Sequence, residues 1–221
     1  MRRAGPVLAL VPLALCGCSA KPPVAPASAP APAAVVEVAD SKEWESTARP
    51  ADQVLIAQLP QRWSRALAAV PRRAAARLKA EGPLVTPAAL EAPSAPPGPY
   101  HCRLVRFGGR AGITTFPPDF CYVEVKDGRL SFTKQTGGNL PQGWLYDDTP
   151  TRQVFLGTMG QGRYGDAPEQ DVAGVLERVS PFRWRLTLTR AGRGALLDAY
   201  ELVPVTPEVP GAPRAVPAKE G

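Results

Sequence analysis

The side chains that could perform catalysis in this sequence are mostly acidic residues in predicted loops. Two neighbouring carboxylates can act as a general acid and a general base, which would suit a hydrolase. The acidic candidates are Asp147, Asp148, Asp166, Glu169 and Asp171. Solvated turns also contain many acidic residues, and this is the simpler interpretation. The single histidine is His101, and no serine or cysteine nucleophile motif accompanies it, so we predict no enzyme and no catalytic residue.

A glycine-rich segment suggests nucleotide chemistry at first sight. Gly160-Gln161-Gly162-Arg163-Tyr164-Gly165 matches the pattern Gly-x-Gly-x-x-Gly and follows a predicted strand. A dinucleotide site also needs a helix that begins at these glycines. Here Asp166-Ala167-Pro168-Glu169 leads towards another strand instead. We therefore predict a loop between two strands and no bound cofactor.

Cysteine chemistry is predicted near the N-terminus, at Cys18. Met1-Arg2-Arg3 is basic and Gly5 to Leu15 is apolar, and this apolar run suits a secretory signal better than a membrane span. The segment Leu15-Cys16-Gly17-Cys18 resembles the lipobox of bacterial lipoproteins, in which the cysteine after a small residue receives diacylglycerol. We predict a signal peptide at residues 1–17 and lipidation of Cys18. An ordinary signal peptide with two incidental cysteines is the alternative.

The signal peptide and the lipidated cysteine together predict a mature protein in the bacterial cell envelope, anchored to a membrane by lipid and facing the periplasm. Ser19 after the lipidated cysteine favours the outer membrane. In such an oxidising compartment Cys102 and Cys121 are expected to form a disulfide, closing a loop of roughly 20 residues and contributing about 3 kcal/mol. Two reduced buried thiols are the alternative. We predict no metal site, because His101 neighbours Cys102 and would point to the opposite face of a strand.

Composition divides the remaining chain into four parts. Residues 18–42 alternate proline and alanine with small residues, which predicts an extended tether. Residues 43–96 form a helical segment and a hinge, residues 97–205 an antiparallel β domain, and residues 206–221 a disordered tail. The formal net charge is +6, and two of the positive charges would leave with the signal peptide. A balance this small gives no case for nucleic acid as a partner.

The helical segment has one apolar stripe and many basic residues. Trp63, Ala66, Leu67 and Val70 recur with the spacing of one helix face, and Pro50 suits the first turn of a helix. A positive face near a membrane could contact lipid headgroups or lipopolysaccharide phosphates, although a solvated face is the simpler interpretation. The basic residues are Arg62, Arg65, Arg72, Arg73, Arg77 and Lys79.

The last part of the chain has the alternation of β-strands. Phe182, Trp184, Leu186 and Leu188 are predicted to share one buried face, and Lys126-Asp127-Gly128-Arg129 predicts a tight hairpin turn. About eight short strands without helices between them favour a small antiparallel β-barrel or sandwich, preceded by a short α-helical segment. The predicted strands are residues 100–107, 120–125, 130–134, 143–146, 153–159, 172–179, 182–188 and 197–203.

Several short segments of this β region are similar to an uncharacterised proteobacterial envelope family, catalogued as domain of unknown function 4893. The segments include Tyr100-His101-Cys102-Arg103, Gly143-Trp144-Leu145-Tyr146, Asp171-Val172-Ala173-Gly174 and Glu201-Leu202-Val203. The resemblance extends over roughly Trp44 to Pro204. It implies the fold and the envelope compartment, and it brings no known activity or catalytic residue.

We expect a non-enzymatic role in binding a lipid or a small hydrophobic molecule, which requires space that the barrel's own side chains do not fill. The first alternative is a protein-binding module such as a hydrolase inhibitor, and the second is a carboxylate-dependent hydrolase. An envelope lipid or an envelope protein is therefore the expected partner. Tyr146, Tyr164 and Asp171 are the candidate contacts. Tyr164 is expected in an exposed loop, and Trp184 in the core.

Overall fold

The computed structural model describes residues 43–206 of the 221-residue chain. The predicted signal peptide, the lipidation of Cys18, the proline-rich tether and residues 207–221 of the predicted tail lie outside the described residues. None of the helices within residues 43–206 is both long enough and apolar enough to cross a membrane.

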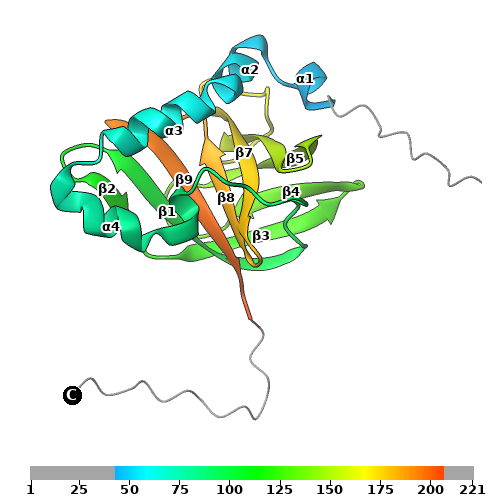
Figure 1. The fold of residues 1–221 in the computed structure, drawn as a ribbon. Helices are drawn as coiled ribbons and strands as arrows, with labels where there is room; N and C mark the ends of the chain where they lie inside the picture. The colour runs from blue at the N-terminus through cyan, green and yellow to red at the C-terminus, as the bar shows by residue number, and fades with distance from the viewer. Residues whose placement is uncertain (1–42, 207–221) are drawn as a thin grey trace, which may run out of the picture. The chain divides into compact units, whose positions relative to one another are not determined.

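Within the described residues, one antiparallel sheet closes on itself (Figure 1). Each strand pairs with the next along the chain from β3 to β9, β1 pairs with β3, and β1 also pairs with β9. These eight strands form a closed barrel, and the short strand β2 extends the sheet beside the second half of β1. The strands are β1 (Gly98–Gly108), β2 (Gly112–Thr115), β3 (Asp119–Lys126), β4 (Arg129–Lys134), β5 (Pro141–Thr149), β6 (Arg152–Met159), β7 (Asp171–Ser180), β8 (Arg183–Leu188) and β9 (Ala195–Pro204).

The prediction of a mainly β fold with a preceding helical segment is confirmed, and the architecture is a barrel rather than a sandwich. Each predicted strand overlaps an observed one, whereas β2 was not predicted. The predicted tight turn is also present, because Asp127 and Gly128 both adopt positive φ angles between β3 and β4.

The prediction that Phe182 shares the buried face of Trp184 is wrong. Trp184 is only 3% exposed, as expected for a core residue, but Phe182 is 74% exposed. The reason is local: Pro181 and Phe182 form the turn between β7 and β8, so the alternating pattern begins one residue later, at Arg183.

Side chains on the inner face of the barrel form a buried core. The predicted disulfide between Cys102 and Cys121 is formed within this core and joins β1 to β3, with the two Cα atoms 5.8 Å apart. Its residues are diagonal neighbours, because Tyr100 lies opposite Cys121 and Cys102 lies opposite Asp119. The inner core consists of Ala95, Tyr100, Cys102, Leu104, Cys121, Val123, Phe132, Leu145, Phe155, Val172, Leu176, Trp184, Leu186, Leu188, Tyr200 and Leu202.

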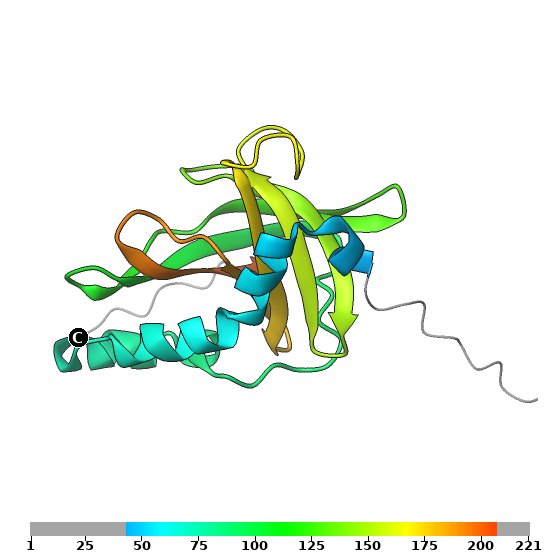
Figure 2. The ribbon, with the colours of Figure 1, turned by 90° about the horizontal axis from the view of Figure 1, so that it is seen from above.

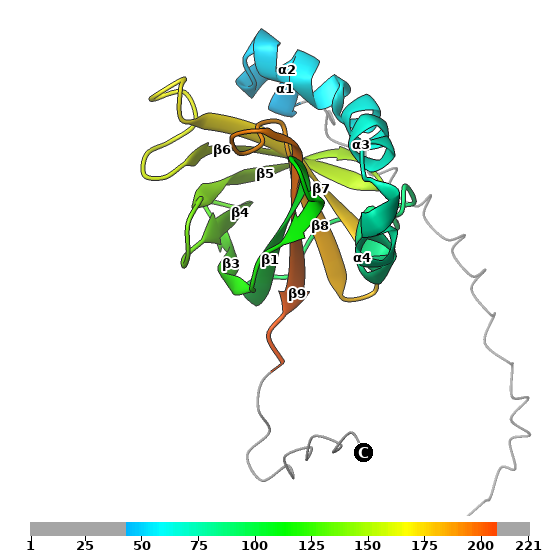
Figure 3. The same cartoon turned by 90° about the vertical axis from the view of Figure 1, so that its left-hand side faces the viewer.

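A layer of short helices covers part of the outer wall of the barrel (Figures 2 and 3). The α-helices are α1 (Glu43–Thr47), α2 (Pro50–Ala57), α3 (Leu59–Ala68) and α4 (Ala75–Ala80), and the 3-10 turns are η1 (Arg72–Ala74) and η2 (Gly82–Val85). As predicted, Pro50 occupies the first turn of a helix and Ala66 is fully buried. A second hydrophobic core lies between these helices and the barrel wall, and Val70, which follows the end of α3, packs against it.

Several arginines of the helical segment bind the barrel directly. Arg62 donates to the carbonyl of Thr189, and Arg77 donates to the carbonyls of Ala111 and Ile113. Arg73 donates to the carbonyl of Arg110 at 2.6 Å. Much of the basic character of this segment therefore serves to attach the helical layer to strand ends and loops of the barrel.

Candidate functional site

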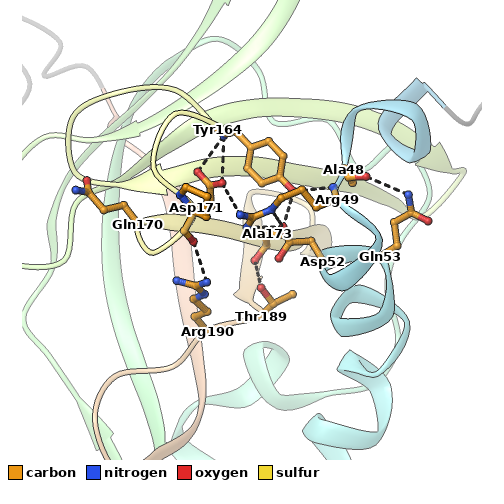
Figure 4. A network of polar contacts seen from close by, with 12 residues as sticks. Ala48, Arg49, Asp52, Gln53, Tyr164, Gln170, Asp171, Ala173, Thr189 and Arg190 are labelled. Atoms are coloured by element: carbon orange, nitrogen blue, oxygen red, sulfur yellow. Dashed lines mark hydrogen bonds and ion pairs between the residues drawn. The ribbon is translucent and has the colours of Figure 1, made fainter.

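Two of the three predicted contact residues, Tyr164 and Asp171, lie in one network with Arg49 and Asp52 (Figure 4). Arg49 directly precedes α2 and Asp52 lies in its first turn, Tyr164 lies in the loop between β6 and β7, and Asp171 is the first residue of β7. We call these four residues the clamp. It joins the helical layer, the glycine-rich loop and the barrel wall.

Every charged group of the clamp has partners within it. The Asp171 carboxylate accepts one bifurcated hydrogen bond from the Gly165 N–H, at 3.0 and 3.1 Å to its two oxygens, and pairs with Arg49 at 3.0 Å. The Asp52 carboxylate accepts two hydrogen bonds from Arg49, at 2.9 and 2.8 Å, and one from the Tyr164 hydroxyl. Figure 4 shows the Arg49 side chain between the two carboxylates.

The loop position of Tyr164 is confirmed, but its predicted exposure is wrong. The side chain is half-buried, and its hydroxyl accepts the backbone N–H of Arg49 at 3.0 Å. Burial, followed by the hydrogen bond to Asp52, raises the pKa of Tyr164 above the ordinary value. Burial alone would lower the pKa of Arg49, but hydrogen bonds to Asp52 and Tyr164 raise it instead. Both groups therefore keep their protons, which suits a fixed structural contact.

The glycine-rich loop does not begin a helix. It leads into β7, in agreement with the prediction, and the clamp holds it through Tyr164 and Gly165. Other acidic residues predicted for the loops are also engaged: Asp166 accepts the Arg163 N–H at 3.0 Å, and Asp148 accepts the Trp44 indole N–H at 2.9 Å. Among residues 43–206, no group of three potential metal ligands gathers in one place.

Tyr146, the third predicted contact residue, lies elsewhere. It is on β5, is 6% exposed, and packs in the core beneath the helical layer. The guanidinium of Arg129 lies 4.4 Å from the centre of its ring. The structure therefore brings Tyr164 and Asp171 together but does not bring Tyr146 to them.

A groove runs between α3 and the barrel wall, with a volume of about 280 Å³. Leu59, Trp63, Leu67, Val85 and Val175 supply much of its apolar lining, and we call it the helix groove. Its polar groups already have partners, because the Trp63 indole N–H donates to the Thr187 hydroxyl at 3.1 Å. Arg185 likewise binds Glu177 and the carbonyls of Leu84 and Thr86.

A second cavity, of about 480 Å³, lies at one end of the barrel. Three chain segments surround it: the hinge before β1, the turn between β7 and β8, and the end of β9. We call it the end cavity. Its lining residues are Ala92, Ser94, Pro96, Pro97, Gly98, Pro99, Tyr100, Arg178, Pro181, Phe182, Trp184, Pro204 and Val205.

The end cavity differs from the helix groove in its polar groups. The Trp184 Nε1 and the Arg178 Nε are both buried, and neither has a hydrogen-bond partner among the described residues. The two residues are directly opposite each other in the pairing of β7 with β8, so their side chains are on the same face of the sheet. An apolar cavity with a few convergent polar groups is the usual form of a small-molecule site.

Sequence reasoning missed Arg178, the proline-rich rim and the role of Phe182. One signal was present: Val172, Gly174, Leu176 and Arg178 occupy alternate positions of β7, so a charged residue follows three inward positions. A charged group on an inward position needs a partner or a route to solvent. That pattern predicts a polar site where the strand reaches the end of a barrel.

Fold and site together define a small closed antiparallel β-barrel with an outer helical layer and an apolar cavity at one end. The family described as domain of unknown function (DUF4893) matches residues 44–202, and the chain belongs to this family. A search of curated proteins finds no match. A solved structure described as a redesigned beta barrel is 14% identical, with 50% of this chain and 91% of that chain covered at a TM-score of 0.34.

Proposed function

We propose that this protein is a lipid-anchored envelope protein that binds a small apolar molecule in the end cavity. The observation that carries the proposal is the cavity itself, with apolar walls and two buried donors that lack partners. The inner face of the barrel is filled by its own core side chains, so the ligand site is proposed at the end of the barrel.

The state of the polar groups favours binding over catalysis. Asp52 and Asp171 are buried in the clamp and paired with Arg49, so neither is poised to transfer a proton. Among residues 43–206, those that line the end cavity include no acidic residue, histidine or cysteine. Recognition of a ligand needs only the shape and the donors that are present there.

A fluorescent probe tests the proposal. The uncharged dye N-phenylnaphthylamine should bind the purified chain with enhanced fluorescence, and Phe182→Ser should weaken this binding several-fold, because Phe182 is an exposed apolar part of the cavity wall. Phe120→Ser is the matched control, since Phe120 is 44% exposed and lies on the outer face of β3, away from the cavity. Equal binding by all three proteins contradicts the proposal.

A protein-binding module is the second candidate, and one surface favours it. Phe120 and Tyr122 are 44% and 38% exposed, and the Phe120 ring contacts His101 at 5.3 Å between centroids. Aromatic residues are enriched in protein interfaces. If this candidate is correct, Phe120→Ser will reduce capture of a specific envelope protein while Phe182→Ser leaves it unchanged.

The lipid anchor is supported by the sequence around Cys18 and is tested separately. Radiolabelled palmitate should be incorporated into the full chain in a bacterial host and not into the Cys18→Ala variant. Equal incorporation in both proteins, or incorporation in neither, would remove the anchor from the proposal without affecting the end cavity.

A further inference from the structure

Within residues 43–206, two partly buried arginines have no acidic partner: Arg62, which donates to the carbonyls of Thr189 and Leu196, and Arg178. Arg49 pairs with Asp52 and Asp171, and Arg106 pairs with Asp198 at 2.6 Å. Arg103 and Arg185 are also paired with carboxylates. Among the described residues, Arg178 forms no such ion pair, and its one hydrogen bond goes to the carbonyl of Glu91 at 3.5 Å. Its positive charge is therefore uncompensated beside an apolar cavity.

The Trp184 indole adds a second donor at the same place. Trp184 is 3% exposed, its Nε1 has no hydrogen-bond partner within the part of the chain that the structure describes, and its side chain lies opposite that of Arg178 across the β7–β8 pair. Directly opposed residues in an antiparallel pair have Cβ atoms only about 5 Å apart. A single acceptor group can therefore be reached by both side chains.

We infer that the ligand of the end cavity carries a carboxylate, which accepts hydrogen bonds from Arg178 Nε and Trp184 Nε1. This inference rests on the proposed function. A carboxylate supplies acceptor oxygens for both donors and a negative charge to balance that of Arg178. Charge-assisted hydrogen bonds of this kind are stronger than those between neutral groups. The absence of acidic residues from the cavity lining removes the repulsion that such a ligand would otherwise meet.

The walls indicate how such a molecule lies. Trp184 is buried and Phe182 is 74% exposed, so the carboxylate lies at the floor and the apolar part extends towards the rim. Prolines 97, 181 and 204 supply rigid apolar walls along this path. An amphipathic carboxylate of medium length, such as a fatty acid, has the required chemistry.

Decanoate and decanol separate the two parts of the inference. Each should displace N-phenylnaphthylamine from the purified chain at neutral pH, and decanoate should bind about tenfold more tightly than decanol, because only decanoate forms charge-assisted bonds. Arg178→Met should abolish this preference, and Trp184→Phe should reduce it. Arg183→Met is the matched control. It removes an arginine from the same β7–β8 hairpin, but this arginine is already paired with Glu201. It should leave the preference intact.

The possible failures are distinguishable. If decanoate and decanol displace the dye equally well from the unmodified protein, or if Arg178→Met keeps the preference, the carboxylate inference is overturned and the apolar site stands. If Phe182→Ser does not weaken dye binding, the proposed function is contradicted, and the carboxylate inference that rests on it is contradicted as well. Arg178 is only partly buried, so its variant remains informative even if Trp184→Phe does not fold.

Discussion

The two ends of strand β7 differ in whether an arginine side chain there has an acidic partner. At the first residue, Asp171 is fully buried and meets Arg49, whose remaining donors go to Asp52. Near the last residue, Arg178 has a buried Nε that meets no acceptor among the described residues. At the first end the arginine is paired with carboxylates, and at the other end an arginine nitrogen has no acceptor within the described part of the chain. The difference separates a contact that holds the fold together from a contact available to a ligand.

The free-energy cost of leaving a buried donor unpaired makes the two ends of β7 very different. A buried donor without a partner costs about 1–3 kcal/mol, so most buried polar groups in proteins are paired. The clamp follows this rule completely, and it fixes the loop between β6 and β7 on the helical layer. The end cavity departs from the rule at two donors that stand opposite each other. A bound acceptor would recover that cost.

The largest expected effect is on stability at the clamp. Arg49→Met leaves the buried carboxylates of Asp52 and Asp171 without their cation, and it should lower the free energy of unfolding by about 3 kcal/mol, at the low end for buried pairs because Arg49 is partly exposed. Urea denaturation measures this change. Arg190→Met is the control, since Arg190 is exposed and donates to the backbone carbonyls of Pro168 and Glu169 in the loop between β6 and β7. Equal losses in the two variants would show that the buried charges are unimportant.

The next effect depends on pH and arises at the floor of the end cavity. Burial raises the pKa of Tyr100 to about 12 from an ordinary value of 10.0. The folded protein therefore holds this proton more tightly than the unfolded chain does, so the associated stability is present below about pH 10 and is lost as the pH rises to about 12. The loss should be about 2 kcal/mol.

Tyr100→Phe removes this loss while also removing the hydrogen bond to the Pro96 carbonyl. The variant should be about 1 kcal/mol less stable than the parent at neutral pH, and the gap should close or reverse in strong alkali. Urea denaturation at both pH values measures it. Tyr122→Phe, which removes the hydroxyl of an exposed tyrosine, is the matched control. A constant difference between parent and Tyr100→Phe would contradict the assignment.

The smallest change in stability is expected for substitution of Arg178. Arg178→Met removes the Nε, which has no partner among the described residues, and also the long hydrogen bond to the Glu91 carbonyl. The gain from the first should offset the loss of the second and of side-chain packing, so the free energy of unfolding should change by no more than about 0.5 kcal/mol, while decanoate affinity falls. Arg49→Met should do the reverse: it lowers stability and leaves the decanoate affinity of the folded protein unchanged. If Arg178→Met destabilises the protein as strongly as Arg49→Met, the two ends of β7 do not differ as we describe.

Local patterns were sufficient to predict much of the fold. Alternation located each of the eight barrel strands, the Asp127-Gly128 pair located a hairpin, and the disulfide between Cys102 and Cys121 is formed as predicted. Closure could not be predicted, because alternation is the same in a barrel and in a sandwich. The pairing of β1 with β9 joins residues about a hundred positions apart, such as Leu104 and Tyr200.

The candidate site was harder to predict for the same reason. Tyr164 and Asp171 were chosen as contacts from their loop, but their partner Arg49 lies more than a hundred residues earlier in the chain. Phe182 was assigned to the core because the alternating run extends by one residue into the turn. Whether Arg178 meets an acceptor depends on how three separate chain segments come together around the cavity, and a local sequence pattern cannot predict this arrangement.

The most direct test of the account is an NMR measurement of the tryptophan indole N–H groups during titration with decanoate. Trp184 lines the end cavity and Trp63 lines the helix groove, so each cavity contains its own reporter. We predict that the Trp184 resonance moves downfield as its N–H gains an acceptor, while the Trp63 resonance, already bonded to Thr187, does not move. A shift of the Trp63 resonance with no change in that of Trp184 would contradict carboxylate binding in the end cavity.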